Sequence, residues 1–463
     1  MENKLTKKYG LFTAICMVVG IVIGSGVFFK AQDILNYTGG NMPLGIIAWI
    51  VGGAIMIICA LAFSVLATRF EKVNGLVDYA EATVGERYAY NVGWFMSTIY
   101  YPAMTSVLCW VSARYTLVLF GSSDITGGTC MTLACLYLCL SYALNAFSPK
   151  LAGKFQVSTT VIKLVPLCLM MIVGIIVGIV NGNTPSAFDT WHIVTGGGKW
   201  STLFAAVVAT SFAYEGWIIA TTINSEIKNS KRNLPIALFV GALIIVGVYV
   251  FYYIGLTGGA DVPTLMKDGA TTAFVNIFGK IGGNILNAFI VISCLGTLNG
   301  LMVGCTRGIY SIAARDRGPA AKMFKQVDPV TNMPNNAAAF GLLMCGVWLF
   351  YFYGANLRES LFGLFSFDSS ELPIVTIYAL YIPIFIMFIA KHGKENKVKN
   401  ILLPILAIIA SVAMVFMAVY AHGINKYISA SKEGQFSFPV LFYLIIFAVV
   451  MVFGNIFYKK KDK

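Results

Sequence analysis

Long apolar runs separated by short polar segments are the dominant pattern of this sequence. Most are about the length that crosses ~30 Å of hydrocarbon as a helix, allowing for tilt. The pattern therefore predicts twelve membrane-spanning helices. The predicted spans are residues 9–35, 43–68, 89–120, 129–147, 156–180, 200–227, 235–257, 283–314, 337–353, 364–390, 400–422 and 438–458. Residues 74–87 are shorter and mixed, which favours an interfacial helix, and loop 258–282 has room for a short helix.

Composition agrees with a lipid environment. Of the 463 residues 58% are hydrophobic and 11% are charged, and the mean hydropathy is +0.78. Soluble domains carry about 25% charged residues. The first apolar run follows Lys7 and Lys8 and is too long for the core of a signal peptide, so we expect a retained helix. All of 1–463 is predicted to form a single transmembrane domain.

The net charge of +13 comes from basic residues in short loops and tails between the apolar runs. This placement favours a role in membrane orientation over nucleic-acid binding. With twelve spans, the side that holds both termini carries 23 Lys and Arg, against 7 on the opposite side when Lys30 near the outer end of the first span is included. Basic loops stay in the cytoplasm. We therefore expect both termini to be cytoplasmic, in a multi-pass protein of the cell membrane whose direct surroundings are the lipid bilayer.

The first predicted span contains three small residues in a row, Gly24-Ser25-Gly26. Glycine costs about 1 kcal/mol in a helix interior relative to alanine. Close helix packing explains the spacing of Gly20 and Gly24. It does not explain the consecutive triplet, which favours an unwound segment with exposed backbone N–H groups.

The sixth predicted span has a matching interruption at Gly216, beside Glu215, in TSFAYEGWIIATT. A carboxylate within a membrane span usually faces a partner or a wet cavity. Each interrupted span begins a block of five helices, 9–180 and 200–390, and two further helices follow in 400–458. Paired broken helices in two halves indicate a transporter binding site.

Polarity at the breaks indicates the ligand. Free N–H groups at Ser25 and Gly26, at the start of a half-helix, favour a carboxylate. Free carbonyls at Ile23, Phe212 and Glu215 favour an ammonium group. Together they predict an α-amino acid as the small-molecule substrate.

Lys163 lies inside the fifth span, three residues before Pro166. Its side chain could extend to the interface. Alternatively, its ammonium occupies a cation position, donating to carbonyls freed by the first break and to hydroxyls of Ser293 or Thr297. A fixed ammonium there would replace a bound sodium ion, or it could carry a proton.

Asp368 and Glu371 open the tenth span, where carboxylates cap a helix N-terminus. An alternative places them near the cavity, where they would attract a cationic side chain. The histidines at 192, 392 and 422 fall in predicted loops, the last of them at the edge of the span predicted at 400–422, and the ten cysteines show no metal-ligand spacing. The sequence also shows no nucleophile elbow and no phosphate loop. We therefore predict neither an enzyme nor a metal site or cofactor.

Four motifs in order, GSGVF, FAYEGW, TTVIKLVP and SCLGTLNG, resemble the amino acid–polyamine–organocation superfamily. Within it they are most similar to L-type amino acid transporters and bacterial serine/threonine exchangers, from about residue 7 to 315. The resemblance implies a five-plus-five inverted repeat, the fold of a bacterial leucine transporter, with two accessory helices. It also implies sodium-independent exchange of neutral amino acids by alternating access.

Carried over residue by residue, the resemblance implies that N–H groups of Ser25 and Gly26 bind the carboxylate, and that carbonyls of Ile23 and Phe212 take the amine. The Phe212 ring would close over the substrate, and Lys163 would stand in for sodium. The predicted substrate-binding set is Ile23, Gly24, Ser25, Gly26, Phe212, Ala213, Tyr214, Glu215 and Gly216. The predicted cation-substituting or proton-linked residues are Lys163, Ser293 and Thr297. The predicted pocket or gate residues are Tyr100, Tyr101, Trp217, Ile218, Asn299, Asp368 and Glu371.

Several positions depart from the family pattern. Many members have glycine where Glu215 stands, and Asp368 and Glu371 are unusual for a neutral exchanger. These residues keep a cationic or polyamine substrate, or proton coupling, as alternatives, and a non-transporting amino acid sensor is a remote one. Animal members bond a heavy chain through an outer cysteine. Cys130 has a different setting, so no such partner is predicted.

Overall fold

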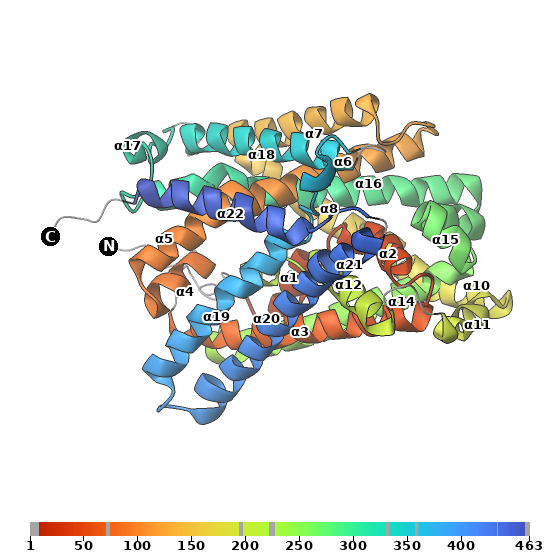
Figure 1. The fold of residues 1–463 in the computed structure, drawn as a ribbon, viewed down its shortest axis with the longest axis horizontal. Helices are drawn as coiled ribbons and strands as arrows, with labels where there is room; N and C mark the ends of the chain where they lie inside the picture. The colour runs from red at the N-terminus through yellow and green to blue at the C-terminus, as the bar shows by residue number, and fades with distance from the viewer. Residues whose placement is uncertain are drawn as a thin grey trace. The chain divides into compact units, whose positions relative to one another are not determined.

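The computed structural model describes residues 9–70, 75–193, 198–221, 227–329, 333–356, 360–432 and 434–458, and the chain there is α-helical (Figure 1). Over these residues no β-strand forms, and one isolated bridge pairs Tyr9 with Ile227. The lysines of both termini, used in the charge count above, lie outside the described residues, as do positions 222–226 of the sixth predicted span.

Nine helices of the described chain are long and apolar enough to cross a membrane. A tenth candidate is the pair α1 (Leu11–Val22) and α2 (Gly26–Tyr37), bent by 55° at their junction. The protein is therefore a multi-pass membrane protein. The third predicted span is continuously helical through α5 (Glu86–Phe95), a π-turn η1 (Met96–Tyr100) and α6 (Tyr101–Leu119), and its membrane crossing stays a prediction.

The helices divide into two compact units. Unit 1 comprises Met1–Ala89, Leu167–Gly283 and Ile374–Ala421, and unit 2 comprises Tyr90–Pro166, Asn284–Pro373 and His422–Lys463. Besides α1 and α2, unit 1 holds α3 (Met42–Arg69), α4 (Leu76–Thr83), η2 (Met170–Gly174), α10 (Ile175–Val180), α11 (Asn183–Phe188), η3 (Asp189–His192), α12 (Gly198–Ala213), α13 (Trp217–Ala220), α14 (Ser230–Gly255), η5 (Leu256–Gly258), α15 (Val262–Asp268), η7 (Val398–Leu402) and α20 (Leu403–Val419). Besides α6, unit 2 holds η1, α7 (Gly128–Phe147), α8 (Pro149–Ile162), α17 (Ala321–Phe324), α18 (Asn335–Ala355), η6 (Gly363–Phe365), α21 (Asn425–Lys432) and α22 (Pro439–Ile456). Five elements cross the division: α5, α9 (Leu164–Leu169), α16 (Ala270–Ala313), α19 (Leu372–His392) and η8 (Tyr420–Ile424).

In unit 1, α3 packs against α12, α14 and α20, while α14 also covers α1. Small residues of α3 allow this closeness: a side-chain carbon at Gly52 would lie 2.0 Å from the Thr210 hydroxyl oxygen, and one at Gly45 would lie 2.1 Å from that of Tyr253. The start of α3 is defined by Asn41, whose side chain accepts the Leu44 N–H at 3.0 Å.

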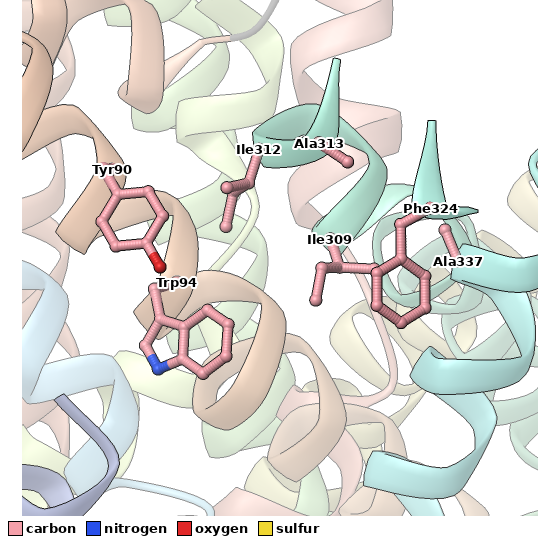
Figure 2. Close-up of a cluster of buried hydrophobic side chains, with 7 residues drawn as sticks. All are labelled: Tyr90, Trp94, Ile309, Ile312, Ala313, Phe324 and Ala337. Carbon is pink, nitrogen blue, oxygen red and sulfur yellow. The ribbon is translucent and has the colours of Figure 1, made fainter. Parts of the chain in front are cut away.

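In unit 2, α6 packs against α7 and α18. Pro102 near the start of α6 has no N–H and so leaves the Thr98 carbonyl without its helical donor. The Trp348 indole of α18 donates to that carbonyl at 2.8 Å, which ties the two helices together. Unit 2 also contains a buried apolar cluster, which includes Trp94 of α5 and Ile309 and Ile312 of α16 (Figure 2).

Several predicted boundaries were wrong. The helical segment predicted at 400–422 runs on to Lys432, because the π-turn η8 continues it. His422 lies inside this turn and is buried, not in a loop. His192 lies in the short helix η3, and His392 is the last residue of α19. The helix predicted at 283–314 follows a kink at Gly279, where φ is +72°, and a separate helical segment from Ala270 precedes the kink within α16. The short helix predicted in loop 258–282 is α15.

Candidate functional site

The break predicted in the first span is present. Helix α1 ends at Val22 and α2 begins at Gly26. Between them Ile23 is extended, with φ −63° and ψ 106°, and Ser25 is buried. The Ser25 hydroxyl makes no hydrogen bond to any described residue. No described backbone group accepts from the N–H groups of Ser25 or Gly26, so both remain available to a ligand.

The break predicted in the sixth span is present too. Helix α12 ends at Ala213, the turn Tyr214-Glu215-Gly216 follows, and α13 is only four residues long. Gly216 adopts φ +107°, a conformation that residues with a side chain rarely take. The Glu215 N–H donates to the Phe212 carbonyl at 3.4 Å, a long bond that occupies this carbonyl only weakly.

Both breaks belong to unit 1, where they touch. A side-chain carbon at Gly26 would lie 2.7 Å from the Ala213 Cα and 3.1 Å from the Phe212 ring. The Phe212 ring meets the ring of Phe29 edge-on, with centroids 5.1 Å apart. A side-chain carbon added at Gly216 would lie 3.3 Å from the Ile21 carbonyl oxygen. The structure thus brings together the two segments that the sequence places about 190 residues apart.

Opposite helix poles meet at this contact. The carboxyl ends of α1 and α12 present backbone carbonyls, and the amino end of α2 presents N–H groups. Helix ends carry partial charges of about half an electron, negative at carbonyls and positive at N–H groups. The arrangement can therefore bind a small zwitterion, with its carboxylate at α2 and its ammonium at the carbonyl ends.

Lys163 lies in unit 2 at the junction of α8 and α9, with 5% of its side chain exposed. Pro166 explains the junction, because it cannot donate to the Ile162 carbonyl. One turn before Lys163, Thr159 contacts Gly296 of α16, where an added carbon would lie 2.3 Å from its hydroxyl oxygen.

The SCLGTLNG motif, residues 293–300 of α16, lies beside this contact and carries two of the predicted hydroxyls. Ser293 is fully buried, and its hydroxyl makes no hydrogen bond to a described residue. The Thr297 hydroxyl donates to the Ser293 carbonyl at 3.0 Å. Lys163 therefore lies one turn after Thr159, the residue through which α8 contacts this motif.

The predicted gate residues fall in different surroundings. The rings of Tyr100 and Tyr101 in unit 2 lie 5.3 Å apart, and Tyr101 packs against Gly304. In unit 1, Trp217 is buried with its ring 5.7 Å from that of Phe63, and Ile218 is also buried.

Asn299 occupies a polar network between helices of unit 2. Its side chain accepts from Asn145 at 2.9 Å and donates to the Ala152 carbonyl at 3.2 Å and to Gln156 at 3.1 Å. These bonds use the amide group to hold α7, α8 and α16 together.

The two carboxylates at the tenth span do different things. Asp368 caps the turn before α19, accepting from the N–H groups of Ser370 at 2.7 Å and Glu371 at 3.2 Å. The Glu371 carboxylate is fully buried, and one of its oxygens lies 2.9 Å from Nε2 of His422. The prediction that Asp368 caps a helix N-terminus is thus confirmed. Glu371 instead pairs with His422, a residue predicted to lie in a loop.

Sequence reasoning missed two residues near the breaks. Tyr249 of α14 contacts both helix ends, and an apolar run of this kind gives no signal for it. Lys30 of α2 is 2% exposed, with its ammonium 3.3 Å from an Asp33 oxygen and 5.8 Å from the Phe212 ring centroid. Its position four residues after Gly26, on the same helix face, was a usable signal.

Comparisons with known proteins identify the family of this chain. The family model described as amino acid permease matches residues 9–456. The serine/threonine exchanger SteT of Bacillus subtilis (strain 168) is 30% identical over 373 residues, 79% of this chain and 82% of the exchanger.

Two mammalian relatives are more distant, and the chain spans less than two thirds of the length of each. The b(0,+)-type amino acid transporter 1 of Oryctolagus cuniculus is 26% identical, covering 68% of this chain and 64% of the relative. The large neutral amino acids transporter small subunit 2 of the same species is 26% identical, covering 71% and 62%. The chain thus belongs to the amino acid permease family, within the amino acid–polyamine–organocation superfamily.

Proposed function

We propose that this permease exchanges neutral L-amino acids across the cell membrane without sodium, by alternating access. The substrate binds where the breaks of the first and sixth spans meet. The observation that carries the proposal is the contact of Gly26 with Phe212 and Ala213, which sets free N–H groups of one helix beside the carbonyl end of another. A similarity to a serine/threonine exchanger supports small neutral substrates.

The proposed architecture has twelve spans, arranged as a five-plus-five inverted repeat with two accessory helices. Nine or ten candidate spans match its helices, and α5–α6 and α12–α13 lie on the remaining two. Both termini are proposed to be cytoplasmic, which follows from the basic loops.

Lys163 is proposed to provide the fixed positive charge that makes sodium unnecessary. Its burial near the SCLGTLNG motif of α16 supports this role, because a charge held away from water needs a function or a partner there. Ser293 and Thr297 are its proposed neighbours.

No heavy-chain partner is proposed. The name of one relative, a small subunit, implies an assembly for that protein. In this chain Cys130 is buried in α7, with its sulfur 3.9 Å from the Trp110 carbonyl oxygen. A buried thiol is unavailable for a bond to another chain.

Proton-coupled symport, or exchange of cationic amino acids, is the second candidate function. Glu215 favours it, because this carboxylate stands in the second break itself and is only partly buried. A carboxylate there can hold a proton or attract a cationic side chain.

Proteoliposomes containing the purified protein decide between these functions. Uptake of labelled serine should require unlabelled amino acid inside and should not change when sodium is replaced by choline. Uptake that needs a sodium gradient would contradict the role of Lys163. Uptake driven by a proton gradient without internal substrate would establish the symporter, and saturable binding without flux would establish a sensor.

Lys163→Ala should reduce exchange at least ten-fold, because it removes the charge that replaces sodium, while protein yield stays close to wild type. Lys154→Ala is the matched control, since Lys154 lies exposed on the same helix and should not matter. If a well-expressed Lys163→Ala protein exchanges at the wild-type rate, the Lys163 ammonium only extends to the membrane interface in the wild type.

A further inference from the structure

The half-helix α2 carries a buried positive charge close to the first break. Lys30 is 2% exposed and lies four residues after Gly26, on the same face of the helix. A buried ammonium group needs partners inside the protein, because water no longer stabilises its charge. The partners of Lys30 therefore indicate what this charge is placed to do.

A carboxylate and two aromatic rings lie next to the ammonium. One oxygen of Asp33, three residues further along α2, is 3.3 Å from Lys30 Nζ. The ring centroids of Phe29 and Phe212 are 5.7 Å and 5.8 Å from the same nitrogen. The face of an aromatic ring attracts a cation within about 6 Å. Phe212 belongs to α12, so the charge stands on the side of α2 that faces the second break.

The contact with Phe212 places this charge beside the proposed substrate site. A side-chain carbon at Gly26 would lie 3.1 Å from the same Phe212 ring. The Gly26 N–H is a proposed partner of the substrate carboxylate, and the Phe212 carbonyl is a proposed partner of the substrate ammonium. A substrate held by these groups is thus separated from the Lys30 ammonium by little more than the Phe212 ring.

A charge at this place changes the preference between substrate side chains. The α-ammonium and α-carboxylate groups are common to all amino acid substrates, so their interactions cancel when two substrates are compared. A positive charge on the side chain is repelled by Lys30, and burial leaves this repulsion poorly screened by salt. Glu215 acts in the opposite sense, because it places a carboxylate in the second break. Asp33 weakens the field of Lys30, because it holds a negative charge next to the ammonium.

We propose that Lys30 is a specificity-determining residue that excludes cationic side chains from the substrate site. The inference rests on the proposed function, and it identifies the group that makes the site favour neutral substrates despite the Glu215 carboxylate. Asp33 sets the strength of the exclusion, because its carboxylate offsets part of the Lys30 charge.

The test compares arginine with citrulline, an uncharged amino acid of nearly the same size and shape, as inhibitors of labelled serine exchange in proteoliposomes. The ratio of their inhibition constants, arginine over citrulline, isolates the charge of the side chain from its size. Lys30→Met removes the ammonium and keeps an unbranched apolar stem, so it should lower this ratio about five-fold. Lys30→Arg keeps the charge and should keep the ratio within two-fold of wild type. An unchanged ratio in Lys30→Met would overturn the proposal.

Asp33→Asn should change the ratio in the opposite direction. It leaves the Lys30 charge uncompensated, so the ratio of the inhibition constants should rise about two-fold. The Asp33 side chain is 42% exposed, which makes this variant easier for the fold to accept than a change at Lys30. A ratio that falls or stays constant in Asp33→Asn would overturn the proposal, even if Lys30→Met does not fold.

Lys267→Met is the matched control. Lys267 is an exposed residue of α15, and its backbone carbonyl accepts a hydrogen bond from Gln32 of α2, so this lysine is attached to the same half-helix. Its variant should show the wild-type ratio, and a fall equal to that of Lys30→Met would overturn the specific role of Lys30. Absence of serine exchange by the wild type would refute the proposed function. Wild-type exchange together with an unchanged ratio in Lys30→Met would refute only the role of Lys30, so the two failures are distinguishable.

Discussion

The two breaks of unit 1 both depend on glycine, for different physical reasons. Gly26 is needed for space, because a side-chain carbon would lie 2.7 Å from the Ala213 backbone. Gly216 is needed for conformation, because its φ of +107° strains any residue with a side chain. The first break is a contact between two helices, whereas the second is a turn within one.

The lengths of the half-helices differ as well. The first break separates α1 and α2, each of 12 residues, which meet at 55°. The second separates the 16 residues of α12 from the four of α13. The first break therefore offers both a carbonyl end and an N–H end, while the second contributes mainly the carbonyl end of α12. This difference is the reason for proposing that the substrate carboxylate binds at the first break.

Gly26→Ala should have the largest effect, because the added methyl group must push the backbone of α12 away. Overpacking of this kind costs about 1–3 kcal/mol, and here the strain falls on the site itself. We expect exchange to drop about 30-fold or more, measured as the initial rate in proteoliposomes. Gly247→Ala in α14 is the matched control, since nothing lies within 4 Å of its added carbon. Equal activity of both variants would contradict the contact between the breaks.

Gly216→Ala should have a smaller effect, about ten-fold on exchange. A left-handed conformation costs a residue with a side chain about 1–2 kcal/mol, and the nearest obstacle, the Ile21 carbonyl oxygen, is 3.3 Å away. The turn can relax, because α13 after it is short. The measurement is again the initial exchange rate, together with the melting temperature of the purified protein. A loss larger than that of Gly26→Ala would show that conformation matters more than space.

Much of this fold could be predicted from the sequence. Apolar length alone located most spans, because a bilayer demands about 20 apolar residues for each helix. The triplet Gly24-Ser25-Gly26 marked the first break, because close helix packing does not require three small residues in a row. Gly216 beside the carboxylate of Glu215 marked the second break, because a carboxylate inside a span needs a partner or a wet cavity.

Contacts between distant helices could not be predicted in the same way. Tyr249 lies in an apolar run like any other, and only the packing of α14 on α1 shows what its hydroxyl reaches. His422 was misplaced because a π-turn extends its helix past the end of the apolar pattern. Its pairing with Glu371 joins residues about 50 positions apart, and no local spacing encodes such a pair.

Glu215→Gln should have the smallest effect and concerns the turn of the second break alone. Glu215 precedes Gly216, and its negative charge should favour cationic side chains over neutral ones by about 1 kcal/mol across a partly wet site. Competition of arginine against labelled serine should weaken about five-fold in the variant, while serine itself changes less than two-fold. Glu86→Gln, an exposed carboxylate at the start of α5, is the control. An unchanged arginine-to-serine ratio would mean that the Glu215 charge is compensated within the protein, so that the second break contributes carbonyls but no side-chain selectivity. A pH dependence of exchange that disappears with Glu215→Gln would instead make this turn the proton-coupling element and leave the first break with substrate binding alone.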